Sequence, residues 1–210
     1  ELPKCFIYLI IWHFDDEGKA QLLQPEELPS VKIRDSESSK EIQINTKHCH
    51  SPHCTLGALE NPSGDYSAKF KCLQDKATKM ALSLHTATIS RNEALVYYRS
   101  MASSGITYSF PSGTLSYQQC KEIQSPITNE LLPSLQCNAN KPCTVIHGST
   151  KFRGIGIPHF FTEQGAHKAR AILRNVRAQT TVSKVMHICL NWTHQLAGTS
   201  KACLEHPQQN

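Results

Sequence analysis

The spacing of apolar residues changes near residue 65, and this change constrains the fold more than any other feature of the sequence. Before it, residues 5–14 and 19–23 flank an acidic turn, and residues 30–34 and 41–45 alternate apolar with polar side chains. Both patterns are typical of β-hairpins. After it, apolar residues within 67–85 recur at the three- and four-residue steps of a helix. The order predicts an α+β fold, with N-terminal antiparallel β-hairpins followed by a mostly α-helical region.

Capping signals place the later helices. Ser90 and Ser116 each stand three residues before a Glu or Gln, which is the pattern of a capping box. The first box predicts a helix that stops near Gly105, and the second predicts a helix that Pro126 kinks or splits. Residues 138–150 are expected to be irregular, with further helices at 162–177 and 182–196. We expect three domains: a β region at 1–65, a helical region at 66–135, and a loop with basic C-terminal helices at 136–210.

The predicted helix at 162–177 has a cationic face. His167, Arg170, Arg174 and Arg177 recur at steps of three and four, so they share one side of a helix. Residues 151–184 contain seven Lys or Arg and a single acidic residue. Such a surface favours a polyanion, of which nucleic acid is the commonest, although a solvated helix surface fits the charge equally well. The residues expected to pack inward are Ala169, Ile172, Leu173 and Val176.

Composition narrows the class of protein. The chain has 210 residues, 39% of them hydrophobic, and a net charge of +5, which by itself does not argue for nucleic acid. Nine cysteines are an odd number for a secreted disulfide framework, so we expect a reduced, intracellular protein in the nucleus or cytoplasm. The apolar run at 6–12 is too short to span a bilayer, so no membrane partner is expected. The first residue is Glu1 rather than Met, and we expect a piece of a longer protein or a processed product.

Metal-binding and catalytic motifs are weak. Cys49 and Cys54 lie among three histidines, and thiolate and imidazole are ligands that zinc prefers, but no second pair lies at a usual distance. A polar loop is the plainer interpretation. Asp15 and Asp16 are interpreted as turn acids because no second carboxylate motif accompanies them. We therefore predict no catalytic residue and no cofactor. A cysteine-dependent hydrolase is a third, enzymatic hypothesis, which needs one unusually reactive thiol.

Several segments, taken in order, resemble the part of a retroelement reverse transcriptase that follows its active site, of the non-LTR kind. Lys4-Cys5 and the apolar run at 6–12 resemble the lysine and strand after the catalytic hairpin. Residues 55–59 resemble the primer-grip strand, and the helices that follow, including residues 91–99 and 120–127, resemble the thumb. The segment Gly154-Ile155-Gly156-Ile157 resembles a glycine-rich element found after the thumb.

The resemblance implies a fragment of an RNA-directed DNA polymerase that is non-catalytic by itself. The fingers and most of the palm, with the aspartates that hold Mg²⁺ in the whole polymerase, would precede Glu1. The expected partners are an RNA or DNA template-primer and that missing N-terminal part. The alternative is a free-standing nucleic-acid-binding module with a zinc site at Cys49 and Cys54. The residues expected to form the primer grip are Leu56 and Gly57. The residues expected to contact the phosphate backbone of the nucleic acid are Lys69, Lys76, Arg170, Arg174 and Arg177.

Overall fold

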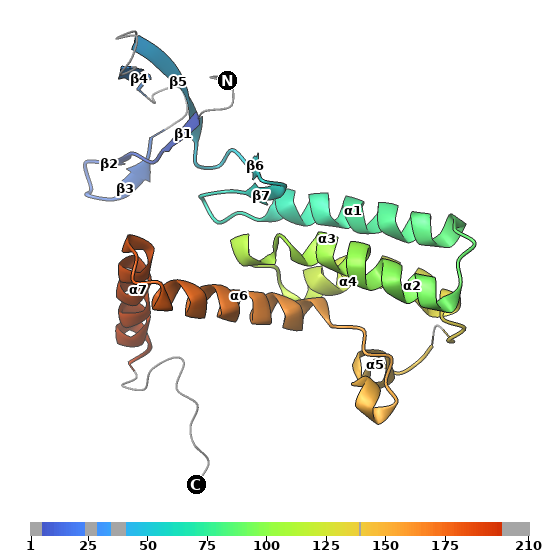
Figure 1. Cartoon of the computed structure of the whole chain (residues 1–210). Coiled ribbons are helices and arrows are strands. Elements are labelled where there is room, and N and C mark those ends of the chain that lie inside the picture. Colours follow the sequence, from blue (N-terminus) through green and yellow to red (C-terminus); the bar gives the residue numbers. More distant parts are fainter. Residues whose placement is uncertain (1–5, 24–28, 35–40, 139, 199–210) are drawn as a thin grey trace. The chain divides into compact units, whose positions relative to one another are not determined.

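The computed structural model describes residues 6–23, 29–34, 41–138 and 140–198. These residues form two compact units, divided between residues 136 and 137. Short β-sheets come first and helices follow (Figure 1), so the predicted α+β fold class is confirmed. The expected features at Lys4 and Cys5 lie outside the described residues.

The N-terminal strands form small sheets. Strand β4 (Val31–Arg34) pairs antiparallel with β5 (Glu41–His48), as the alternating pattern predicts. Strand β1 (Phe6–Leu9) pairs with the other edge of β5, and this pairing is parallel. Strands β2 (Trp12–Phe14) and β3 (Ala20–Leu22) make a separate hairpin. The prediction of one strand over residues 5–14 is therefore wrong, because its two halves pair with different partners.

The predicted strand at 55–59 is also wrong, because it contains a hairpin turn. Strand β6 (His53–Thr55) pairs antiparallel with β7 (Ala58–Glu60). Between them Leu56 and Gly57 have φ angles of 50° and 82°. Two consecutive positive φ values are what a two-residue type I′ hairpin turn requires, and they are incompatible with an extended strand.

The helical part of the first unit is built around α1 (Ser67–Thr86) and α4 (Tyr117–Ser134), which pack against each other (Figure 1). Helix α2 (Arg91–Tyr97), a π-helical segment (Tyr98–Ser103) and α3 (Ser104–Thr107) form one continuous stretch. The core between these helices contains large side chains that are almost completely buried. Burial of each contributes roughly 1.5–3 kcal/mol. These residues include Leu73, Leu84, Tyr98, Ile106, Ile123, Ile127 and Leu131.

Both predicted capping boxes are present. The side chain of Ser90 accepts a hydrogen bond from the Glu93 backbone N–H, and the Glu93 carboxylate accepts one from the Ser90 N–H. Ser116 and its partner three residues on do the same at the start of α4. Of the two outcomes predicted at Pro126, a kink or a split, the split does not occur, since α4 continues to Ser134.

The second unit contains α5 (Cys143–His147), α6 (Phe160–Arg177) and α7 (Thr181–Ala197). Helix α5 lies within the segment expected to be irregular. The glycine-rich segment packs beside it, because the N–H groups of Ile155 and Ile157 donate to the Val145 and Ile146 carbonyls. A Cβ placed on Gly154 would lie 2.2 Å from the Gly148 carbonyl oxygen, so this approach requires glycine.

Candidate nucleic-acid interface

Helix α6 carries the three predicted arginines on its surface. Arg170, Arg174 and Arg177 are exposed and follow one another at steps of four and three residues, so they share a face. At 1.5 Å of rise per residue, the row extends about 10.5 Å along the helix axis. Among the described residues no carboxylate forms an ion pair with any of the three. The row is therefore an exposed set of three positive charges.

The beginning of the same face is less positive. The His167 Nε2 atom lies 3.9 Å from a Glu163 carboxylate oxygen, one turn earlier, and both side chains are about one-third exposed. A protonated His167 would be neutralised by this neighbour. The positive charge is thus concentrated toward the C-terminal end of α6, where cations also interact favourably with the helix dipole.

The opposite face of α6 differs from prediction. Ala169 and Leu173 were expected to pack inward, but both are exposed, and Ile172 and Val176 are half-buried. The fully buried side chains of α6 lie in its first turns, at Phe160 and Gln164.

Two local structures fix the ends of α6. At its start, the His159 ring accepts a hydrogen bond from the Phe161 N–H, and it stacks edge-on with His147 at a centroid distance of 5.0 Å. Burial, and then the charge of His147, lower the pKa of His159, which favours the neutral ring that this acceptor role requires. At its end, the Ser183 hydroxyl of α7 donates to the Val176 carbonyl at 2.8 Å.

The expected grip residues lie in an exposed turn. The Leu56 side chain is 87% exposed, and no atom lies within 4 Å of a Cβ placed on Gly57. Beside this turn is a hollow of about 630 Å³, lined by Phe6, Asn45, Lys47, His53, Cys54, Thr55 and Leu56.

Lys47 is the cation of this hollow. Its ammonium lies 4.3 Å from the centroid of the Phe6 ring and 2.7 Å from Nδ1 of His53. The hollow thus combines one cation with two aromatic rings, groups on which a base can stack and a phosphate can bind. Sequence reasoning missed Lys47, Phe6 and His53 as site residues. No local signal identifies them, because the hollow depends on the parallel pairing of β1 with β5.

The two lysines of α1 that were expected to bind nucleic acid, Lys69 and Lys76, differ from each other. Lys69 is only 3% exposed, and its ammonium donates to the Ser109 carbonyl and, at 2.8 Å, to the Ser112 hydroxyl. A phosphate cannot reach this group, so the expectation of a backbone contact at Lys69 is corrected: the residue joins α1 to the segment after α3. Lys76 is exposed, and its ammonium donates to the Gly105 carbonyl at 2.7 Å.

The aspartates at the first hairpin are turn residues. The Asp15 carboxylate accepts hydrogen bonds from the N–H groups of Glu17 and Lys19 and from the Gln21 side chain. The backbone bond from Lys19 contributes most to lowering the pKa of Asp15. Both carboxylate oxygens are used within the hairpin, as expected of a turn acid.

None of the helices in the described part of the chain is long and apolar enough to cross a membrane. No protein family, curated protein or solved structure was found to match this chain.

Proposed function

We propose that this chain is the palm-end, primer-grip and thumb part of a retroelement reverse transcriptase, and that it binds the backbone of a template-primer. The observation that carries the proposal is the row of Arg170, Arg174 and Arg177 on α6, exposed and without a carboxylate partner among the described residues. The choice of this family rests on the order of the sequence motifs along the chain.

The length of the row suits a nucleic-acid strand. Successive phosphates of one DNA strand are separated by about 3.4 Å along the duplex axis, so a row of about 10.5 Å spans about three steps. Arginine donates paired hydrogen bonds to phosphate oxygens, and its charge releases condensed counterions. Contacts of this kind position a protein on a strand without reading its sequence.

The hollow beside Leu56 provides a second contact in the first unit. A base that enters it can stack on the Phe6 or His53 ring, while Lys47 contributes positive charge. In this proposal the primer-grip-like segment contacts nucleic acid through the residues that line the hollow beside the turn. An extended strand at Leu56 and Gly57 is not needed for this contact.

Binding without catalysis is the expected activity. Phosphoryl transfer by polymerases needs carboxylates that hold two metal ions, and in this proposal those residues belong to the part of the polymerase before Glu1. The fragment therefore holds nucleic acid and does not extend a primer.

The test is fluorescence anisotropy with the full chain and two labelled duplexes of equal length and unrelated sequence. We expect both duplexes to bind with similar affinity and both affinities to fall steeply between 50 and 200 mM salt. A primed template with Mg²⁺ and nucleotides should show no extension. Affinity that is insensitive to salt, or that differs strongly between the two duplexes, would contradict backbone binding, and primer extension would contradict the assignment of the fragment.

A further inference from the structure

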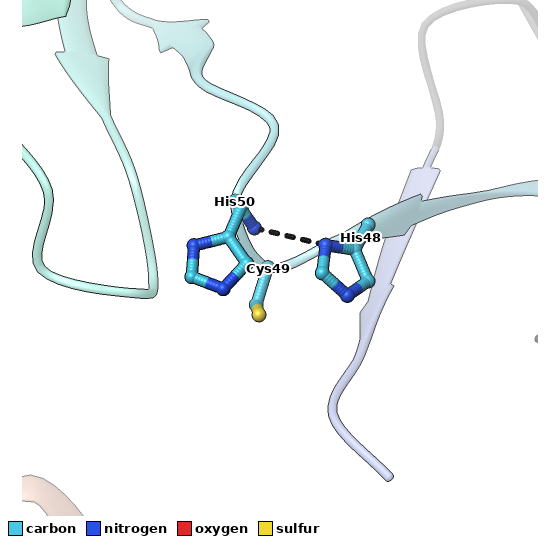
Figure 2. A group of neighbouring side chains, drawn as sticks. All are labelled: His48, Cys49 and His50. Carbon is cyan, nitrogen blue, oxygen red and sulfur yellow. Dashed lines mark hydrogen bonds between the residues drawn. The ribbon is translucent and has the colours of Figure 1, made fainter. Parts of the chain in front are cut away.

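We propose that His48, Cys49 and His50 form a zinc site with three protein ligands and a fourth position open to solvent. His48 ends strand β5, and the other two residues form the turn that follows. Figure 2 shows the two imidazole rings on either side of the Cys49 side chain. One donor atom from each residue lies within 4.8 Å of the other two. This proposal does not depend on nucleic-acid binding by α6.

Hydrogen bonds to its backbone carbonyls hold the turn that presents these ligands. The carbonyls of His48, Cys49 and His50 accept hydrogen bonds from the Ser51 N–H, the Ser63 N–H and the Asn61 side chain, at 2.9, 3.2 and 3.5 Å. The next carbonyl, that of Ser51, accepts from the Tyr8 hydroxyl at 2.9 Å. Because four successive carbonyls have partners, β1 and the loop after β7 hold the backbone that carries the three ligands.

The hydrogen bonds of His48 leave its Nδ1 atom as the nitrogen that can bind a metal. Its Nε2 atom lies 3.2 Å from the Leu23 carbonyl, which can only accept, so the proton of the neutral ring is on Nε2. The other nitrogen, Nδ1, accepts only a long contact of 3.4 Å from the His50 N–H. An imidazole that donates one N–H to a backbone carbonyl and binds metal through the other nitrogen is the common arrangement in protein metal sites.

The ligand set favours zinc. A thiolate and two imidazoles are borderline-soft donors, and hard cations such as Mg²⁺ prefer oxygen. Tetrahedral zinc, with bonds of about 2.0–2.3 Å, holds its ligand atoms roughly 3.3–3.6 Å apart. Because the three donor atoms lie within 4.8 Å of one another, their largest separation must contract by at most about 1.3 Å. The His50 side chain is exposed and can make this movement, whereas Cys49 is only 4% exposed and stays in place.

This site differs from the zinc site at Cys49 and Cys54 that the sequence indicates as an alternative. Cys54 is exposed on β6 and does not belong to the three-residue group. The neighbouring His53 accepts from Lys47 through Nδ1. A variant at Cys54 is therefore the matched control: it removes a nearby thiol and leaves all three proposed ligands unchanged.

The test titrates the metal-free full chain with Co²⁺, whose spectrum reports thiolate coordination, and then with Zn²⁺ in competition with a chromophoric chelator. We expect one equivalent of Co²⁺, a thiolate-to-cobalt charge-transfer band and displacement by Zn²⁺. Cys49→Ser should abolish the band, His50→Ala should weaken affinity by tenfold or more, and Cys54→Ser should change neither. His50→Ala keeps the test decisive should Cys49→Ser fail to fold, because the His50 side chain is exposed. Absence of the band in the unmodified chain, or its equal loss in Cys54→Ser, would overturn the site.

Discussion

Replacing Arg170, Arg174 and Arg177 together with glutamine removes the positive row of α6 and keeps long polar side chains on the helix. Because all three are exposed and lack a carboxylate partner among the described residues, the helix should persist. Surface substitutions of this kind usually change the free energy of unfolding by no more than about 0.5 kcal/mol each. The thermal unfolding midpoint should therefore shift little.

The effect on binding follows from counterion release. Each phosphate contact adds about 0.9 to the slope of log affinity against log salt on duplex DNA, so three lost contacts lower the slope by about 2.7. Over the fourfold salt increase from 50 to 200 mM, a slope difference of about 2.7 changes the affinity by a factor of about 40. The advantage of the unmodified chain over the variant should therefore shrink about 40-fold across this range.

Anisotropy titrations at four or five salt concentrations measure this slope. The matched control replaces Lys71, Lys79 and Lys121 with glutamine, which removes the same charge from exposed positions on α1 and α4. An equal loss of slope in both variants would refute a specific contact by α6, because overall charge alone would then explain binding. Unfolding of the arginine variant would refute the assignment of these side chains to the surface.

Other consequences of the structure concern stability. Lys69→Met should lower the free energy of unfolding by about 1–3 kcal/mol, since the Ser109 carbonyl loses its donor, and should leave the salt slope of binding unchanged in anisotropy. Gly154→Ala should cost about 2–3 kcal/mol because its Cβ meets a carbonyl oxygen, whereas Gly165→Ala, on an open surface of α6, should gain about 1 kcal/mol in thermal denaturation. The pKa of Glu93 is lowered by hydrogen bonds from the Ser90 hydroxyl and, second, from the Ser90 N–H. The ionised Glu93 carboxylate therefore stabilises the fold at pH values above the pKa that it has in the unfolded chain. This stabilisation is lost as the pH falls through the pKa that Glu93 has in the folded protein. Replacing that serine with alanine should cost about 1 kcal/mol at pH 7, and the difference should narrow in acid, as measured by denaturation at several pH values.

The helices other than α5 could be predicted because their signals are local. The capping boxes at Ser90 and Ser116 each involve residues three positions apart, and the arginine row of α6 follows from helix periodicity alone. Such signals act within one or two turns and do not depend on the rest of the fold.

Two of the wrong predictions depend on contacts between distant segments. The break between β1 and β2 exists because Phe6 lies opposite Asn45 in a parallel pairing that no local pattern indicates. Lys69 is at the edge of the apolar face of α1, within about 20° of Met80 at 100° per residue, and its burial depends on acceptors about forty residues away.

The candidate sites also differ in whether local sequence signals or contacts between distant segments form them. The arginine row was predictable in full, whereas the hollow around Lys47 required the arrangement of β1, β5 and β6. The histidines and cysteine of the β5 turn were visible in the sequence, where the alternative considered for a zinc site joined Cys49 to Cys54. Spacing alone does not show that Cys49 lies with the two histidines beside it.

Binding of nucleic acid by this chain is proposed to depend on contacts made by the arginines of α6. Arginine-specific chemical modification of the full chain, read by mass spectrometry with and without saturating duplex, tests it most directly. We expect bound duplex to protect Arg170, Arg174 and Arg177, while exposed Arg34 and Arg91 react equally in both conditions. Equal modification of the three α6 arginines with and without bound duplex would contradict it.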